Sequence, residues 1–432
     1  MAIRAAGSPV FVPAANADLR ERLLLVVLYV TMLASSIAVI EPSPHDFLMG
    51  VLALACVIAG VHFERRLLAL FVLLLAWNAG GFLSLLNVPT GDKAVQYTAT
   101  SLYLSLAAVI FGCLLAEHTM PRLVTLRTAY VLTAVLTALL GICGYFNAFP
   151  HAHDWFAPGD RALGGFKDPN VFGPFLIWPT LILLERMIVR HVRALDVALL
   201  GVLLLGIFLC FSRGAWFHLA VSTVVVIALA FLTAPTPAAR MRIFAATAVT
   251  LAVLAALLAL ALSFDIIAAM FNERFHLINS YDVGEGGRFR LQELALAAML
   301  QFPNGMGPFE FSRVYGLQQH NVYLQAFMVY GWIGGMSYLL ILASTIMVGL
   351  RNVLVPTPWQ PYLIAAFGAF IGEVLEGFVI DTDHWRHFFL LLGMIWGLSA
   401  ATYRHLRRQR AALPQARMVE GSMVQESMAH VG

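Results

Sequence analysis

Charged residues are scarce in this sequence, where they make up 12% of the 432 residues. Water-soluble globular proteins carry about twice that share, roughly 25%. Hydrophobic residues account for 60% of the chain, and its mean hydropathy is +0.81. Too little polar surface remains to cover a soluble particle of this size. The composition therefore excludes an ordinary soluble globular protein and indicates one that lies in a membrane.

Cysteine and net charge are scarce as well. The four cysteines all lie in apolar stretches and form neither a Cys-x-x-Cys pair nor a metal-ligand spacing. They predict packed thiols, and we expect neither a metal nor a cofactor. The formal net charge of +3 is too small to favour a nucleic-acid partner.

Long apolar segments dominate the chain. A helix needs about 20 mainly apolar residues to cross the hydrocarbon core of a bilayer, which is roughly 30 Å thick. The candidates are residues 23–40, 47–63, 67–86, 98–115, 129–146, 171–188, 195–211, 215–233, 243–264, 322–350, 362–380 and 388–403. They predict an all-α, polytopic integral membrane protein of about twelve transmembrane helices. No short apolar stretch with a small-residue cleavage site precedes them, so we expect the first segment to be an anchor.

Alternate loops between these segments are basic. Their arginines are Arg20, Arg22, Arg65, Arg66, Arg122, Arg127, Arg186, Arg190, Arg193, Arg240, Arg242 and Arg351, and the tail adds Arg404, Arg407, Arg408 and Arg410. The other loops are longer or mix acids with bases, so the positive-inside rule puts both termini in the cytoplasm. The predicted parts are a cytoplasmic N-terminus (1–22), the first membrane helices (23–264), a large periplasmic loop (265–321), the last membrane helices (322–403) and a cytoplasmic basic tail (404–432).

The loop 265–321 is long enough to hold structure of its own. Within it, residues 291–302 have apolar side chains at helical spacing, which predicts an amphipathic helix at the membrane surface. A glycine-rich run ending at Gly287 precedes this helix, and Pro303 ends it. Loops of this length are uncommon unless they carry a function.

Three arginines stand out on the side predicted to be periplasmic. Arg213 lies in a very short turn between two apolar segments, where its charge runs against the cytoplasmic bias. Arg288 and Arg290 open the amphipathic helix, where positive charge opposes the helix dipole. A bound phosphate would resolve that conflict, because backbone N–H groups and guanidinium groups both fit it. Arginines at helix ends also occur simply as solvated charges.

Other polar residues allow further interpretations. His320 directly precedes the segment 322–350 and is suited to take a proton from a hydroxyl, although a lone histidine is more often only a satisfied polar residue. Asp381 and Asp383 form a weak signal for an acid–base group or a metal pair. Asn170 follows Pro169 and is expected to cap the next helix.

Glu373 and Glu376 lie one helical turn apart inside a predicted membrane helix. Acids within a membrane are usually functional or paired, so these two favour a transporter. Two features oppose a transporter. The sequence contains no inverted repeat of broken helices, and its polar residues concentrate in one outer loop rather than at mid-membrane.

A series of short motifs surrounds that loop. It comprises Gly-Phe-Lys-Asp-Pro-Asn-Val-Phe-Gly at 165–173, Ser-Arg-Gly-Ala-Trp at 212–216, Gly-Arg at 287–288, Pro-Asn-Gly-Met-Gly at 303–307, His-Asn-Val-Tyr-Leu at 320–324 and Tyr-Gly-Trp-Ile-Gly-Gly at 330–335. In order and position the series resembles the O-antigen ligase and O-antigen polymerase family of bacterial membrane glycosyltransferases. The segment 303–307 is shorter than is common in that family.

The resemblance implies glycan transfer at the periplasmic face of the bacterial inner membrane. The donor would be a glycan on a polyprenyl (undecaprenyl) diphosphate. The acceptor would be a sugar hydroxyl of lipid A–core for a ligase in lipopolysaccharide biosynthesis, which is slightly favoured, or of another lipid-linked glycan for an O-antigen or exopolysaccharide polymerase. Membrane lipids would surround the enzyme. Neither a nucleotide sugar nor, for ligases, a metal would take part.

By the same resemblance, Arg213 and Arg288 hold the two arginine positions of the family and His320 holds its histidine. A single displacement with inversion is expected, in which His320 takes the acceptor proton and the arginines stabilise the leaving diphosphate. Further substrate contacts are expected from Arg290, Arg161, Lys167 and Asn321. A glycosidase-type carboxylate pair that includes Asp168 or Asp383 remains an alternative.

Overall fold

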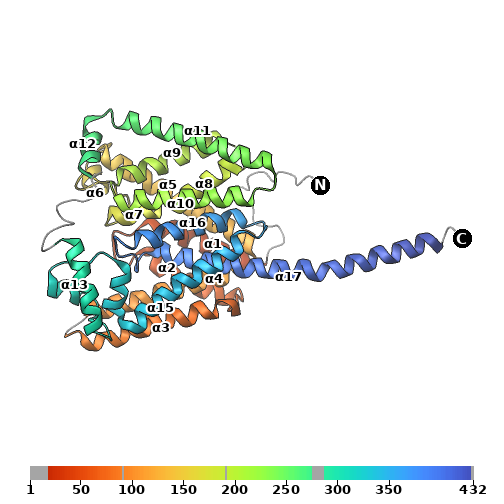
Figure 1. The fold of residues 1–432 in the computed structure, drawn as a ribbon, viewed down its shortest axis with the longest axis horizontal. Helices are drawn as coiled ribbons and strands as arrows, with labels where there is room; N and C mark the ends of the chain where they lie inside the picture. Colours follow the sequence, from red (N-terminus) through yellow and green to blue (C-terminus); the bar gives the residue numbers. More distant parts are fainter. Residues whose placement is uncertain (1–17, 90–91, 190–191, 275–286, 430–432) are drawn as a thin grey trace.

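The computed structural model describes residues 18–89, 92–189, 192–274 and 287–429. Within these ranges the protein is all-α, as predicted, because it contains helices and no strand. The α-helices are α1 Leu19–Leu33, α2 Pro44–Ile58, α3 Leu68–Ser84, α4 Asp92–Ala116, α5 Thr119–Tyr145, α6 Ala152–Phe156, α7 Pro169–Phe175, α8 Ile177–Val189, α9 Ala194–Leu209, α10 Arg213–Thr233, α11 Pro237–Ala261, α12 Asp265–Arg274, α13 Arg288–Gln301, α14 Glu310–Tyr315, α15 Val322–Val353, α16 Gln360–Glu376 and α17 Arg386–Ala429. In Figure 1, α12 and α13 lie at the end of the bundle opposite to that from which α17 extends.

Seven helical stretches in the described residues are long and apolar enough to cross a membrane. They are Arg65–Asn87, Asp92–Ala116, Thr119–Tyr145, Pro169–Val189, Arg213–Thr233, Pro237–Leu260 and Val322–Val353, and two shorter apolar helices are Pro44–Ile58 and Ala194–Leu209. Each of the twelve apolar segments predicted from the sequence coincides at least in part with a helix. The prediction of a polytopic membrane protein is therefore confirmed, while the number of twelve crossings stays a prediction.

Glycines bring the long helices into close contact. A Cβ atom on Gly80 of α3 would collide with the Tyr330 carbonyl of α15, and one on Gly393 of α17 would lie 2.5 Å from the Ala108 carbonyl of α4. Lipid tails are as apolar as leucine side chains, so membrane helices associate through such close packing rather than through the hydrophobic effect. These contacts fix the positions of α3, α4, α15 and α17 relative to one another.

Ion pairs mark the two ends of the bundle. Near the start of α17, Arg386 donates to both carboxylate oxygens of Asp46, at 2.8 and 2.7 Å. Further along α17, Arg404 contacts Glu64 and also Glu117, the latter at 2.7 Å. The two arginines are separated by about 27 Å at 1.5 Å per residue. The mixed loop that contains Asp46 and the basic loops near Glu64 and Glu117 therefore lie at opposite ends, and which end faces the periplasm remains a prediction.

The helix predicted in the large loop is present as α13, while its place at the membrane surface stays a prediction. It begins at Arg288 rather than at residue 291, because extended Gly287 is its N-cap. Its buried residues Leu291, Ala295 and Ala298 pack with Met328 of α15 in one apolar cluster. The inner face of α13 is thus covered by the protein itself.

The segment 303–307 that follows α13 fits into a kink of α15. The kink is at Gly331, whose φ of 64° and ψ of −168° are not helical. The N–H of Trp332 donates to the Pro303 carbonyl at 2.8 Å, and the N–H of Met306 donates to the Met328 carbonyl at 2.7 Å. A side chain at Gly331 would lie 2.6 Å from the backbone of Asn304. The large loop is therefore fixed to α15 through main-chain bonds.

Candidate functional site

His320 and Asp381 lie together at one end of the bundle. His320 has a left-handed backbone (φ 49°) and directly precedes Asn321, whose side chain caps α15. The N–H of Val322 donates to the carbonyl of Gly377 at 2.8 Å, which ties this turn to the end of α16. The His320 Nδ1 lies 3.8 Å from Asp381 Oδ2, and the two side chains are 45% and 20% exposed. A partly exposed imidazole therefore lies beside a largely buried carboxylate.

The surrounding charges set the protonation of this pair. Burial lowers the pKa of His320 below its usual 6.5, the positive charge of Arg288 adds to this effect, and Asp168 opposes it. Burial and the neighbouring Asp383 raise the pKa of Asp381 to about 7, against the effect of Arg288. Arg288 thus acts electrostatically on both members of the pair. The imidazole is neutral near pH 7 and can accept a proton.

Two of the three arginines singled out in the sequence, Arg213 and Arg288, each begin a helix. Arg288 is the first residue of α13, and Arg213 is the first residue of α10, where the Ser212 hydroxyl accepts from a backbone N–H. A Cβ on Gly214 would lie 2.6 Å from Glu376 Oε1, which brings the start of α10 against the end of α16. Both arginines are half-buried. Guanidinium groups at helix N-termini provide an electropositive site suited to phosphate.

Arg161 and Asn170 tie the loop after α6 to the core. Arg161 Nε donates to the Cys210 carbonyl and its Nη2 to Asn170 Oδ1, both at 2.9 Å. The prediction that Asn170 caps the next helix is wrong. Asp168 is the cap, and its carboxylate accepts from the Asn170 N–H at 2.8 Å. Pro169 occupies the first helical position, which it suits because it lacks an N–H group, so the cap lies before the proline.

The other predicted substrate contacts have partners within the chain. Lys167 is exposed and lies 3.3 Å from Glu41. Arg290 is exposed and pairs with Glu293 on the same helix at 2.6 Å. Asn321 accepts from two backbone N–H groups at the start of α15. Asn321 therefore stabilises the turn that holds His320. Lys167 and Arg290 instead pair with the carboxylates of Glu41 and Glu293, which are not part of the His320–Asp381 pair.

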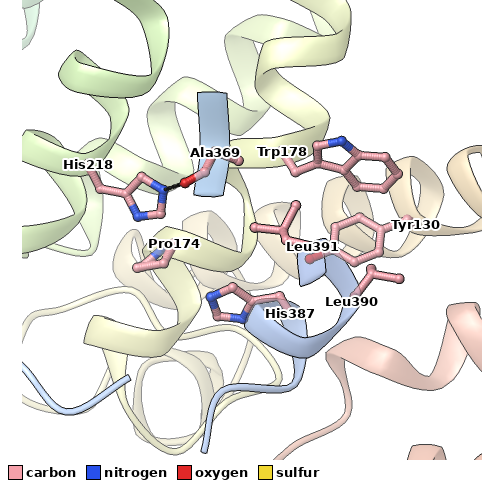
Figure 2. A pocket seen from close by; sticks show the side chains of 8 residues that line it. All are labelled: Tyr130, Pro174, Trp178, His218, Ala369, His387, Leu390 and Leu391. Carbon is pink, nitrogen blue, oxygen red and sulfur yellow. Dashed lines mark hydrogen bonds between the residues drawn. The ribbon is translucent and has the colours of Figure 1, made fainter. Parts of the chain in front are cut away.

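The sequence interpretation missed two buried histidines. His218 Nδ1 lies 2.8 Å from Glu376 Oε2, and His387 Nε2 lies 3.4 Å from Glu373 Oε1. In Figure 2 both imidazoles face a small cavity of about 10 Å³, which Tyr130 also lines. The available signal was that acids within a membrane usually pair with another polar residue. In the described residues, no three histidine, cysteine, aspartate or glutamate side chains are placed to hold a metal ion.

The fold defines a polytopic α-helical membrane protein, and His320, Asp381 and Arg288 lie near one another at one end of its bundle. Residues 198–339 match the model of the family described as O-antigen ligase. This match, over about a third of the chain, agrees with the resemblance found in the sequence. The matched stretch runs from α9 into α15 and contains Arg213, Arg288 and His320. It implies a membrane glycosyltransferase of the O-antigen ligase or polymerase type. No curated protein matches the chain.

Proposed function

We propose that the protein transfers a glycan from a polyprenyl (undecaprenyl) diphosphate to a sugar hydroxyl of an acceptor at the periplasmic face of the bacterial inner membrane. The favoured acceptor is lipid A–core, which makes the protein an O-antigen ligase of lipopolysaccharide biosynthesis. The observation that carries the proposal is the position of His320. Its imidazole lies beside Asp381, and its pKa is lowered by burial and by Arg288.

The chemistry is a single displacement. His320 takes the proton of the acceptor hydroxyl while the hydroxyl oxygen forms a bond to the anomeric carbon of the donor. The bond from that carbon to the diphosphate oxygen breaks, and its electron pair leaves with the polyprenyl diphosphate. Arg213 and Arg288 stabilise the charge that develops on this leaving group. Attack from the face opposite to the diphosphate inverts the anomeric carbon.

Asp381 supports His320 in this scheme. It lies near Nδ1, so Nε2 is the nitrogen that remains for the acceptor hydroxyl. A carboxylate near Nδ1 favours the tautomer with the proton on Nδ1 and stabilises the imidazolium that forms during transfer. Their separation of 3.8 Å exceeds a hydrogen bond, and such contacts often shorten when substrate binds.

Two alternatives from the sequence fit the geometry less well. A glycosidase-type mechanism needs a free carboxylate, but Asp168 caps α7 and Asp383 accepts from Tyr97 at 2.9 Å. A transporter would use Glu373 and Glu376, yet both are buried against histidines. A polymerase would use the same chemistry with a lipid-linked glycan as acceptor.

The pH dependence follows from the two ionisations. As the pH falls through about 7, Asp381 takes up a proton because its pKa is raised to that value. His320 takes one at a pH below 6.5, since its pKa is lowered. We expect log kcat/KM to fall in two steps on the acid side, and Asp381→Asn to remove the upper step and lower the plateau. An Asp381→Asn profile that matches the wild type would contradict the assigned role.

The acceptor is tested by a transfer assay on the purified protein in lipid. The protein receives a polyprenyl-diphosphate-linked glycan with or without lipid A–core, and the products are separated by size. Glycan moved onto lipid A–core is the expected result. A ladder of longer lipid-linked glycans without lipid A–core would identify a polymerase instead. No transfer to either acceptor would overturn the proposal, and flux measurements on Glu373→Gln and Glu376→Gln variants would then test transport.

A further inference from the structure

The buried pair of His218 and Glu376 joins two helices next to the site. His218 lies on α10, five residues after Arg213, and Glu376 is the last residue of α16. The His218 side chain is 1% exposed and the Glu376 side chain is completely buried. Nδ1 of His218 lies 2.8 Å from Glu376 Oε2, and Nε2 lies 2.8 Å from the Ala369 carbonyl. Both ring nitrogens are thus engaged with the same helix.

These contacts fix how many protons the pair carries. The Ala369 carbonyl can only accept, so Nε2 of His218 must carry a proton and donate it. The remaining proton lies in the short bond between Nδ1 and the carboxylate, on one partner or the other. Either arrangement leaves the pair with no net charge. A buried pair of this kind is well suited to set the register of two helices, because any slip would leave polar groups unpaired in an apolar interior.

Glycines surround the pair on both helices. A Cβ on Gly372 of α16 would collide with His218 and Ser222, and one on Gly368 would lie 2.6 Å from Val226. From the other side, a Cβ on Gly214 of α10 would lie 2.6 Å from Glu376 Oε1. At these glycines the side chains of one helix therefore pack directly against the backbone of the other. The polar pair lies at the end of this contact that is nearest to Arg213.

The residues that follow Glu376 contact the turn that holds His320, the proposed general base. The next residue, Gly377, accepts the N–H of Val322 at 2.8 Å. The side-chain amide of Asn321 donates to the carbonyl of Phe378 at 3.2 Å. His320 directly precedes Asn321, which is followed by Val322. The end of α16 thus touches the start of α10 on one side and the turn of His320 on the other.

We infer that His218 and Glu376 are positioning residues, which hold the helix of Arg213 in register with the turn of His320. This inference rests on the proposed function for its catalytic consequence. The geometric part stands apart from it, because the pair fixes α10 against α16 whatever reaction takes place. Neither residue touches the reacting atoms in this scheme.

The test compares Glu376→Leu with Glu376→Gln and with Ser222→Ala as a matched control. Glutamine can donate from its amide to a neutral His218 and keeps the contact, whereas leucine cannot. Ser222 is buried on the same face of α10, one turn further from Arg213, and its hydroxyl has no hydrogen-bond partner among the described residues. We expect Glu376→Leu to lower kcat at least about tenfold per folded molecule, since small displacements of catalytic groups cost up to about 10²-fold. Glu376→Gln and Ser222→Ala should stay within about threefold of the wild type.

A spectroscopic distance gives a second readout that needs no activity. Cysteines replace Phe217 on α10 and Ile333 on α15, which are 49% and 54% exposed, and each carries a spin label. Cys143, which is not fully buried, is first changed to serine so that it takes up no label. The wild type, Glu376→Gln and Ser222→Ala should give one narrow distance distribution. Glu376→Leu should give a shifted or broadened one. If Glu376→Leu does not fold, Gly214→Ala takes its place, because the added methyl group displaces the Glu376 carboxylate while alanine favours the helix.

The outcomes separate the two claims. An unchanged distance distribution in Glu376→Leu, or in Gly214→Ala where that variant replaces it, overturns the positioning role whether or not the wild type transfers glycan. A shifted distance with native kcat per folded molecule overturns the catalytic consequence. Loss of activity in Glu376→Gln equal to that in Glu376→Leu would also overturn it, because the carboxylate itself would then be required. A wild type that transfers no glycan but shows the expected distances would refute the proposed function alone.

Discussion

Replacing His320 by alanine is expected to lower kcat for glycan transfer by about 10²- to 10⁴-fold, the contribution of a positioned general base. The loss should fall on kcat rather than on the KM for the lipid-linked donor, because the imidazole acts on the acceptor hydroxyl. His320 is partly exposed in a turn, so the folded structure should survive. Steady-state transfer rates together with thermal unfolding of the same preparations measure both effects.

His151→Ala is the control for this substitution. His151 is a second histidine outside the long apolar helices; it is 70% exposed and lies 3.2 Å from Asp154. Its removal should leave kcat within about twofold of the wild type, as for surface changes remote from the chemistry. Equal rates for His320→Ala and wild type would remove the base from the mechanism.

Replacing Arg288 by glutamine is expected to lower kcat by about 10²- to 10³-fold, the effect of losing one group that stabilises a developing anion. The pH profile should change as well. Arg288 lowers the pKa of both His320 and Asp381, so without it both pKa values rise and the acid limb moves to higher pH. The joint change of rate and pH profile tests both effects of Arg288, on the leaving group and on the ionisation of His320 and Asp381.

Arg290→Gln provides a matched control two residues away on the same helix. Arg290 is exposed and pairs with Glu293, an interaction worth at most about 1 kcal/mol at a surface. We expect kcat and the acid limb of Arg290→Gln to stay close to those of the wild type. Similar losses in both variants would mean that the general positive potential of this helix, rather than Arg288 itself, supports transfer.

Local patterns in the sequence predicted the helices and the main charged residues. Apolar length located the membrane segments, and helical spacing located α13 in the large loop. The same helical spacing also distinguishes the positions of Arg288 and Arg290 on α13. Arg288 precedes buried Leu291 and Ala295 by one and two turns, whereas Arg290 precedes exposed Glu293. Periodicity thus carries information about which arginine lies on the inner side of the helix.

Contacts between distant residues could not be predicted in the same way. His218 and Glu376 are 158 residues apart, and their bond depends on how α10 packs against α16. The neighbourhood of His320 and Asp381 likewise depends on the Val322–Gly377 bond. The error at Asn170 was local, because Asp168 before the proline competes for the same cap. Capping chemistry alone does not decide between two suitable residues so close together.

The kink of α15 at Gly331 affects how sequence variation in the segment 303–307 and around the kink should be interpreted. The bonds that join 303–307 to α15 use main-chain atoms, which every residue possesses except for the missing N–H of proline. Selection can therefore change most side chains here, but not Gly305, Gly307 and Gly331, whose φ values of 79°, 97° and 64° strain other residues. In a family alignment these three glycines would be as invariant as residues that perform chemistry. Their invariance would record a shape inherited by descent, and ranking positions by conservation alone would mistake it for contact with a substrate.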